Sequence, residues 1–304
     1  MAGSGEIAIR TTALTKRFRA LTALDALDLE VNRGEVFGYI GPNGAGKSTT
    51  IRLLLDLLRP TSGHAELLGQ DVRRHGAEVR RRLGYLAGEL SLYESLSGRD
   101  VLTFLARLRG GVDDSRVDEL IERFGLPPDR RIRDLSKGNK QKIGLIQAFM
   151  HDPEVLILDE PTSGLDPLLQ QTFHELVREV QRDGATVLLS SHVLSELEYV
   201  ADRVAMIRQG KLLAVARIEE LKRAAPRRVA VSFAQPIPPD AFNGLQGVGD
   251  VEVRGALARF TVTGDMDAVI KAIAHHHVVS LTAQEPDLQD LFLSSYTTHD
   301  SADA

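Results

Sequence analysis

The sequence predicts an α/β protein with a mostly parallel sheet covered by helices on both faces, followed by a small α+β domain. Its 304 residues are enough for two domains with buried cores. The segments "VLILDE" and "TVLLSS" are almost continuously apolar and alternate with helical patterns at about 167–183 and 193–201, as is typical of a parallel sheet. After Lys222 the pattern changes at "RAAPRR", which indicates a domain edge.

The first domain begins with strand patterns and continues with helical ones. Residues 6–40 contain three predicted strands, "IAIRTTAL", "ALDALDLEV" and "EVFGYIG". Between Lys47 and Leu58 the apolar residues fall on one helical face, and "RPTSG" ends that helix. Further helical patterns occupy about 97–109, 114–124 and 136–150.

The last part of the chain has an order of its own. "RVAVSF", "VEVRG" and "ARFTVTG" predict strands, "DMDAVIKAIAHH" a helix, "VVSLTAQ" a strand and "DLQDLFLSSY" a short helix. This order is close to a split βαβ fold of about 75 residues. We therefore expect a large domain at 1–222, a small α+β domain at 227–296 and a flexible tail at 297–304.

Composition and charge exclude several classes of protein. The net charge of −5 and the pI of about 6.0 argue against a broad electrostatic interaction with nucleic acid, and no nucleic-acid partner is expected. The absence of cysteine excludes disulfides, thiolate metal sites and cysteine nucleophiles. No apolar run approaches the roughly 18–20 residues of a membrane span, and "MAGSGEIAIR" does not resemble a secretory signal. We expect a soluble chain that reaches a membrane only through another protein.

The strongest single motif is "GPNGAGKS", from Gly41 to Ser48, which fits G-x-x-x-x-G-K-[ST] between a predicted strand and a helix. The glycines let backbone N–H groups approach phosphates, Lys47 reaches the phosphate oxygens, and Ser48 can ligate Mg²⁺. The motif alone predicts only a nucleotide. The expected nucleotide-binding residues of the loop are Gly41, Pro42, Asn43, Gly44, Ala45, Gly46, Lys47, Ser48 and Thr49.

Two later segments supply polar groups at the ends of buried strands. "VLILDE" places Asp159 where it can hold Mg²⁺, and Glu160 where it can orient and deprotonate an attacking water. The alternative is an acid pair that caps a helix. "SSH" places His192 at the end of the next strand, near Glu160, where it can contact a γ-phosphate or have a purely structural role.

The segment "DLSKGNKQK" opens another helix with small and polar residues, and a helix N-terminus is a second anion-binding site. Together with the phosphate loop, "VLILDE" and "SSH", it makes residues 6–221 resemble the nucleotide-binding subunit of ATP-binding-cassette (ABC) transporters. The resemblance implies a P-loop NTPase cassette with an N-terminal antiparallel β part and a helical subdomain. It also implies a head-to-tail dimer of two copies, in which the signature residues contact the partner's ATP. These residues are Ser136, Lys137, Gly138 and Asn139, where Lys137 and Asn139 depart from the commonest form, LSGGQ.

The same resemblance implies roles for residues that spacing alone does not single out. Phe18 in "LTKRF" would stack on adenine, Asp166 in "SGLD" would lie at the dimer seam, and His192 would be the switch histidine. The region "GYLAGELSLYE" departs from the family, because Gly88 stands where a glutamine usually ends the strand. We expect Glu89 to take over that role, and the alternative is that Glu89 is only a surface acid.

The function that the resemblance implies is ATP hydrolysis, with ATP and Mg²⁺, at the cytoplasmic face of a membrane beside separate permease subunits. "EPDLQDLFLSSY" resembles the tail of the daunorubicin/doxorubicin-resistance branch, which favours efflux of a drug or antibiotic. Export of lipid, polysaccharide or ions remains an alternative. A soluble ABC ATPase acting on ribosomes or DNA is disfavoured by the single cassette, the acidic charge and the missing cysteines. A small-molecule kinase explains neither "LSKGN" nor "SGLD".

Overall fold

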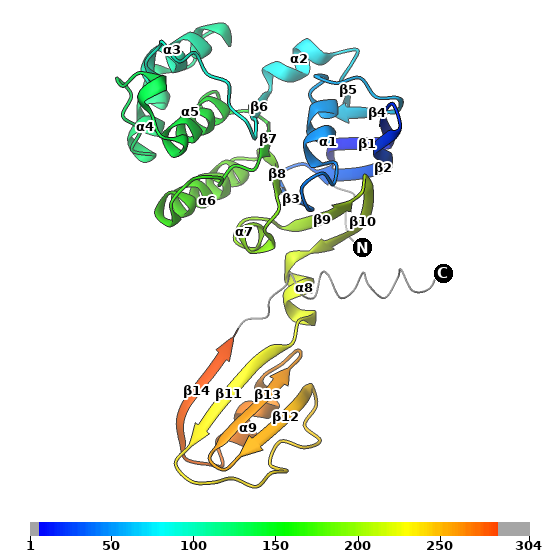
Figure 1. Ribbon diagram of the computed structural model, residues 1–304, viewed down its shortest axis with the longest axis vertical. Helices are drawn as coiled ribbons and strands as arrows, with labels where there is room; N and C mark the ends of the chain where they lie inside the picture. The colour runs from blue at the N-terminus through cyan, green and yellow to red at the C-terminus, as the bar shows by residue number, and fades with distance from the viewer. Residues whose placement is uncertain (1–5, 285–304) are drawn as a thin grey trace. The chain divides into compact units, whose positions relative to one another are not determined.

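The computed structural model describes residues 6–284, and the chain divides after Ala216 into two compact units (Figure 1). The division lies a few residues before the domain end expected at 222, because helix α8 (Ile218–Ala224) groups with the second unit. The helix expected at "DLQDLFLSSY" and the tail at 297–304 lie outside the described residues. Within residues 6–284 no helix is long and apolar enough to cross a membrane.

The first unit opens with an antiparallel sheet of strand order β2-β1-β4-β5. Strands β1 (Ile7–Phe18) and β2 (Leu21–Asn32) form a long hairpin, and β1 also pairs with β4 (Ser62–Leu67). The short strand β5 (Gln70–Asp71) completes the sheet. This sheet is the antiparallel part that the resemblance implies, and the end of its hairpin carries Phe18.

The central sheet has the order β10-β9-β3-β8-β7-β6, so strands distant in sequence become neighbours. Strand β3 pairs in parallel with β8 and β9, and β7 pairs in parallel with β6 and β8. Every residue of β3, β7 and β8 is buried, which explains their continuous apolar sequences. The strand bounds are β3 Val36–Ile40, β6 Leu83–Leu86, β7 Val155–Asp159, β8 Thr186–Ser191, β9 Arg203–Arg208 and β10 Lys211–Arg217.

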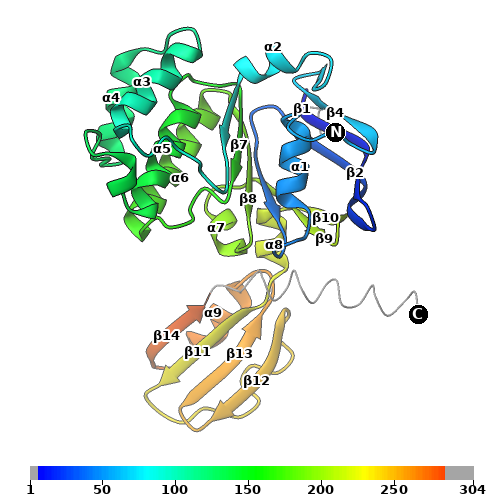
Figure 2. The same ribbon diagram turned by 45° about the horizontal axis from the view of Figure 1, so that its top comes forward.

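The predicted helices of the first unit occur in the expected order, and the short helix α2 occurs in addition to them. Helices α3, α4 and α5 group together as a helical part (Figures 1 and 2). Helices α1 and α7 are shorter than their apolar patterns predict. Helix α1 ends at Leu54 because Asp56 adopts a left-handed backbone with φ 54°. The bounds are α1 Lys47–Leu54, α2 Gly76–Arg81, α3 Gly98–Leu108, α4 Asp114–Arg123, the 3₁₀ turn η1 Ile132–Asp134, α5 Lys137–Phe149, α6 Pro167–Arg182 and α7 Leu194–Glu198.

The second unit contains a four-stranded sheet of order β12-β13-β11-β14. Strands β13 and β14 both run antiparallel to β11, so helix α9 connects two parallel strands that are separated by β11. This is the predicted split βαβ arrangement, with an aromatic core that includes Phe233, Phe242 and Phe260. The bounds are β11 Arg227–Phe233, β12 Val248–Arg254, β13 Leu257–Val262, α9 Asp267–Ile273 and β14 Val278–Gln284.

Candidate nucleotide site

A cleft of about 660 Å³ lies in the first unit, at the carboxyl ends of β3, β7 and β8. Its size is that of a small-molecule site, and in α/β sheets this edge is where ligands bind. The cleft therefore gathers, in one chain, most of the residues that the sequence singles out. Those that line it are Phe18, Pro42, Asn43, Gly44, Ala45, Gly46, Lys47, Ser48, Thr49, Glu89, Asp159, Glu160 and His192.

The phosphate loop needs its glycines for space and for backbone conformation. A Cβ at Gly41 would lie 2.3 Å from the carbonyl oxygen of Ile207. Gly46 has φ 114°, a conformation that favours glycine, and it precedes α1 without any side-chain cap. The first N–H groups of α1 are therefore left for a ligand in the cleft.

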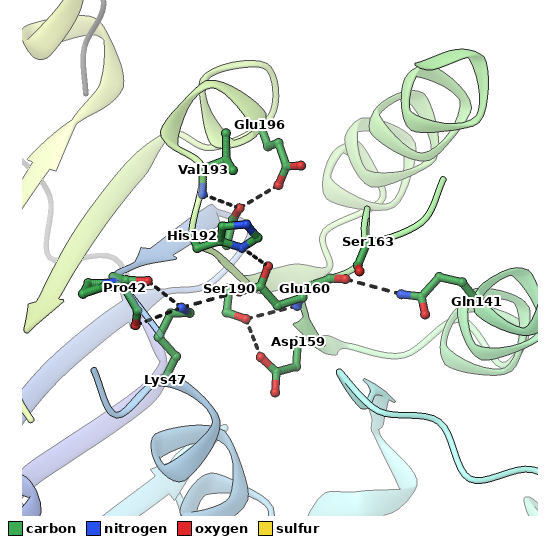
Figure 3. A network of polar contacts seen from close by, with 12 residues as sticks. Pro42, Lys47, Gln141, Asp159, Glu160, Ser163, Ser190, His192, Val193 and Glu196 are labelled. Carbon is green, nitrogen blue, oxygen red and sulfur yellow. Dashed lines mark hydrogen bonds and ion pairs between the residues drawn. The ribbon is translucent and has the colours of Figure 1, made fainter. Parts of the chain in front are cut away.

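Lys47 lies at the start of α1 with its side chain 6% exposed. Its ammonium donates to the carbonyl of Gly41 at 2.5 Å and of Pro42 at 3.5 Å, and lies 3.4 Å from the Glu160 carboxylate (Figure 3). Lys47 and the catalytic candidate Glu160 thus meet across the cleft. They are 113 positions apart in the sequence, and neither motif by itself predicts that they are neighbours. A cation held here can contact phosphate oxygens.

Asp159 and Glu160 have different surroundings. Asp159 is 5% exposed and accepts a hydrogen bond from the Ser190 hydroxyl at 2.6 Å. Glu160 has a left-handed backbone with φ 50°, and its carboxylate lies 2.7 Å from Nδ1 of His192. The adjacency expected for Glu160 and His192 is present, because β7 and β8 are parallel neighbours and pair Asp159 with Ser190.

The surroundings of Asp159 fit Mg²⁺. A buried carboxylate normally has a cationic partner or a metal, and within residues 6–284 no lysine, arginine or histidine forms an ion pair with Asp159. Hard oxygen ligands such as this carboxylate and the Ser48 hydroxyl suit the ion. Both side chains belong to residues that line the same cleft.

The region of the missing glutamine also faces the cleft. A Cβ at Gly88 would lie 3.3 Å from Oδ2 of Asp159, so a side chain at this position would start beside the buried carboxylate. Glycine leaves that space open, and Glu89, the next residue, lines the cleft. The structure therefore places Glu89 in the right region, and its role stays a prediction.

Phe18 is 44% exposed at the end of β1 and lines the cleft beside Leu21. The ammonium of Lys16 lies 4.8 Å from the centre of its ring. An exposed aromatic face at the rim of a phosphate-binding cleft is a platform on which a base can stack.

The signature residues lie elsewhere. Ser136 caps α5 and accepts a hydrogen bond from the N–H of Asn139 at 3.3 Å. None of the residues 136–139 is among the described residues that line the cleft. Asp166 likewise caps its helix, α6, by accepting from the N–H of Leu169 at 3.0 Å. One chain therefore does not bring the signature to its own phosphate loop.

Two polar residues of the site were not predicted from the sequence. Ser190 bridges Asp159 and the Glu160 backbone, and the amide of Gln141 donates to the carbonyls of Glu160 and Pro161. A signal for each exists, because Ser190 is a hydroxyl at the end of an otherwise apolar strand and Gln141 is a buried amide on α5.

Comparison with known proteins identifies the family. The family described as ABC transporter matches residues 24–163. The bacitracin transport ATP-binding protein BcrA of Bacillus licheniformis is 38% identical over 295 residues, which cover 94% of this chain and 96% of that protein. This chain belongs to the ABC transporter ATP-binding proteins. The daunorubicin resistance ATP-binding protein DrrA3 of Streptomyces coeruleorubidus is 41% identical over 222 residues, which cover 71% of this chain and 70% of DrrA3.

Other relatives differ in how much of them the chain spans. The probable multidrug ABC transporter ATP-binding protein YbhF of Escherichia coli is 40% identical over 223 residues, but the match covers only 38% of the length of YbhF. Among solved structures, an ATP-binding subunit of an ABC transporter superimposes with a TM-score of 0.67 at 31% identity, covering 71% of this chain and 92% of that one. The predicted family and fold class are thereby confirmed.

Proposed function

We propose that this protein is the ATP-hydrolysing subunit of a two-component exporter, which works at the cytoplasmic face of a membrane beside separate permease subunits. The observation that carries the proposal is the Glu160 carboxylate, which lies between Lys47 and His192 in the cleft of the phosphate loop. A carboxylate in this position can accept a proton from water while a cation and backbone N–H groups stabilise the transferring phosphoryl group.

Each residue of the cleft has a task in this reaction. Phe18 stacks on the adenine, and the N–H groups of residues 43–49 bind the phosphates together with Lys47. Glu160 orients the attacking water and takes its proton, while His192 holds the Glu160 carboxylate at 2.7 Å. Ser48 and Asp159 would hold Mg²⁺, which when bound neutralises charge on the phosphates.

The signature residues complete the site of a second copy. Because residues 136–139 do not line the cleft of their own chain, their helix N-terminus is available to the ATP of another copy in a head-to-tail dimer. Asp166 would lie at the seam of this dimer. Two clefts then become complete only when two copies close together on two ATP molecules.

The names of the relatives indicate the class of cargo. They are called bacitracin transport, daunorubicin resistance and probable multidrug proteins, and all three cargo classes are antibiotics or drugs. We therefore favour efflux of an antibiotic-like compound over export of lipid, polysaccharide or ions. Recognition of the cargo belongs to the permease subunits.

The test of the chemistry uses the purified chain and its Glu160→Gln variant. We expect the unmodified chain to hydrolyse ATP, whereas Glu160→Gln retains ATP binding, loses hydrolysis and accumulates as an ATP-bound dimer in light scattering. Exposed Glu122 on α4 provides the control Glu122→Gln, which should behave as the unmodified chain. Undiminished turnover in Glu160→Gln would remove the assignment.

The test of transport is capture of the tagged chain from detergent-solubilised host membranes, with identification of the bound proteins. A stoichiometric protein with several membrane spans would support the exporter. Capture of ribosomes or DNA instead would favour the soluble alternative while leaving the ATPase chemistry intact.

A further inference from the structure

The peptide backbone of Glu160 is strained and is held on both sides by buried side chains. Its φ of 50° is uncommon for a residue with a Cβ, and such residues persist only where their surroundings hold them. On one side, the N–H of Glu160 donates to Ser190 Oγ at 3.1 Å. On the other, the Gln141 amide donates to the carbonyl of Glu160 at 3.3 Å (Figure 3). It also donates to the carbonyl of Pro161 at 3.1 Å.

Gln141 is a buried polar residue, and burying its amide costs free energy unless the amide is hydrogen-bonded. It is 4% exposed, and the residues one turn further along the same face of α5, Gly144 and Leu145, are buried as well. A buried amide is tolerated only where it is hydrogen-bonded, and both of these bonds go to the segment that carries the Glu160 carboxylate. Burial in a core favours apolar side chains and does not require an amide, so packing alone does not explain why a glutamine stands here.

The first turns of α5 contact the same segment at two further points. The Lys137 ammonium donates to Ser163 Oγ at 3.4 Å. A Cβ at Gly138 would lie 2.7 Å from the carbonyl oxygen of Gly164, so the two backbones are in close contact there. Three residues near the start of α5, Lys137, Gly138 and Gln141, thus contact the segment from Glu160 to Gly164.

We propose that Gln141 is a positioning residue, which holds the strained Glu160 peptide so that its carboxylate faces Lys47, and which links this carboxylate to the signature turn of its own chain. The proposal rests on the proposed function, because only ATP hydrolysis gives the Glu160 carboxylate its role. Since the signature turn binds the partner's ATP in that function, Gln141 connects the ATP bound by one copy to the catalytic group of the other ATP site. Without its amide, the Glu160 backbone relaxes and the carboxylate leaves its place.

The first experiment compares Gln141→Met with Gln147→Met in the full chain. Gln147 lies on the same helix and also donates to a backbone carbonyl, that of Tyr85, but has no contact with the cleft. Both changes remove one amide that donates to backbone carbonyls, at nearly constant volume, so both should lower the melting temperature. We expect Gln141→Met alone to lower kcat for ATP about tenfold or more, with KM within about twofold. Equal kcat for the two variants would overturn the proposal.

A shorter amide serves as a second variant. Gln141→Asn keeps the donor but is one methylene too short to reach both carbonyls, so its kcat should lie between those of the unmodified chain and Gln141→Met. If Gln141→Met shows no cooperative melting transition, Gln141→Asn takes its place against Gln147→Asn. A kcat in Gln141→Asn equal to that of its control would again overturn the proposal.

Mixed dimers then show on which site Gln141 acts. One copy carries Glu160→Gln, so single-turnover hydrolysis reports only the site that contains the intact Glu160. Gln141→Met on the copy with the intact Glu160 should slow that turnover about tenfold. The same change on the Glu160→Gln copy should slow it less, because only the signature contact is then altered. The reverse order would contradict positioning within one chain, whereas no hydrolysis by the unmodified dimer would contradict the proposed function instead.

Discussion

The N-termini of helices α1 and α5 are the two that we assign to ATP, but they differ in what surrounds them. Neither helix has an acidic residue in its first turn, whereas α3 and α4 have Asp100 and Asp114 there. Helix α1 follows Gly46 with no side-chain cap and opens into the cleft. Helix α5 is capped by Ser136 and lies outside the cleft lining.

The difference shows how one chain can carry two halves of two different sites. The uncapped N–H groups of α1 need a phosphate from the cleft of their own chain. The capped turn of α5 is stable without any ligand, because its hydroxyl satisfies one of the first N–H groups. In the proposed dimer this turn binds the ATP of a second copy, and its contacts to residues 160–164 would couple that binding to the chain's own cleft.

The largest effect is expected from removing the cation at the start of α1. Lys47→Ala should lower ATP hydrolysis by roughly two to three orders of magnitude, because the phosphoryl group loses its buried charge partner. It should also weaken nucleotide binding, measured by the fluorescence of a labelled ATP analogue. Lys211→Ala removes an exposed lysine paired with Asp25 and should leave both quantities unchanged. If Lys47→Ala binds the nucleotide as tightly as the unmodified chain does, Lys47 does not contribute to phosphate binding.

The second prediction separates capping from catalysis at α5. Ser136→Ala and Ser97→Ala both remove an N-cap serine, from α5 and α3 respectively, and each should cost about 1 kcal/mol of stability in denaturant unfolding. Only Ser136→Ala should also lower hydrolysis, by about tenfold, since in the proposed dimer only the Ser136 hydroxyl contacts the partner's ATP. If hydrolysis falls equally in both variants, the N-terminus of α5 has no role beyond its own helix.

The phosphate loop and the strands that carry the acidic residues could be predicted from the sequence. The phosphate loop is predicted by its spacing. The apolar strands that end at Asp159 and Ser191 predict that Glu160 and His192 lie at the same edge of a parallel sheet. These predictions depend on local patterns and on the rule that parallel strands end together. They therefore survive without knowledge of side-chain contacts.

What could not be predicted depends on backbone conformation and on contacts between distant segments. The left-handed φ of Glu160 leaves no trace in residue type, because glutamate is not a residue that favours it. Gln141 is one of several polar residues near the start of α5, and only the fold shows that its amide turns inward to residues 160 and 161. The early end of α1 has the same origin, since a left-handed Asp56 stops a helix whose apolar pattern continues.

A smaller effect is expected in the region of the missing glutamine. Glu89→Ala should raise the Mg²⁺ concentration for half-maximal ATP hydrolysis by about threefold, because a carboxylate near Asp159 adds an oxygen ligand to that side of the cleft. Glu94→Ala removes a nearby acid that pairs with Lys140 outside the cleft and serves as the control. An unchanged Mg²⁺ dependence in Glu89→Ala would leave Glu89 as a surface acid.

The smallest effect on hydrolysis is expected at the opposite end of α5, just beyond its C-cap Met150. Burial, and then the positive charge of Arg109, lower the pKa of His151 to about 4, and Nε2 of its ring lies 2.7 Å from the guanidinium. The folded chain therefore keeps His151 neutral, whereas the unfolded chain takes up a proton near its ordinary pKa of about 6.5. This contribution to stability is complete above pH 6.5 and is lost as the pH falls towards 4.

Removal of the imidazole should consequently make the protein less sensitive to acid. Between pH 7 and pH 5 the free energy of unfolding should fall by about 1–2 kcal/mol less in His151→Gln than in the unmodified chain, measured in denaturant at each pH. His75→Gln, at an exposed position, should retain the original pH dependence. Hydrolysis at pH 7 should be unchanged in His151→Gln, because the residue lies outside the cleft. Identical pH dependence with and without His151 would show that this end of α5 does not govern acid stability, and a loss of hydrolysis would show that the two ends of the helix are not independent.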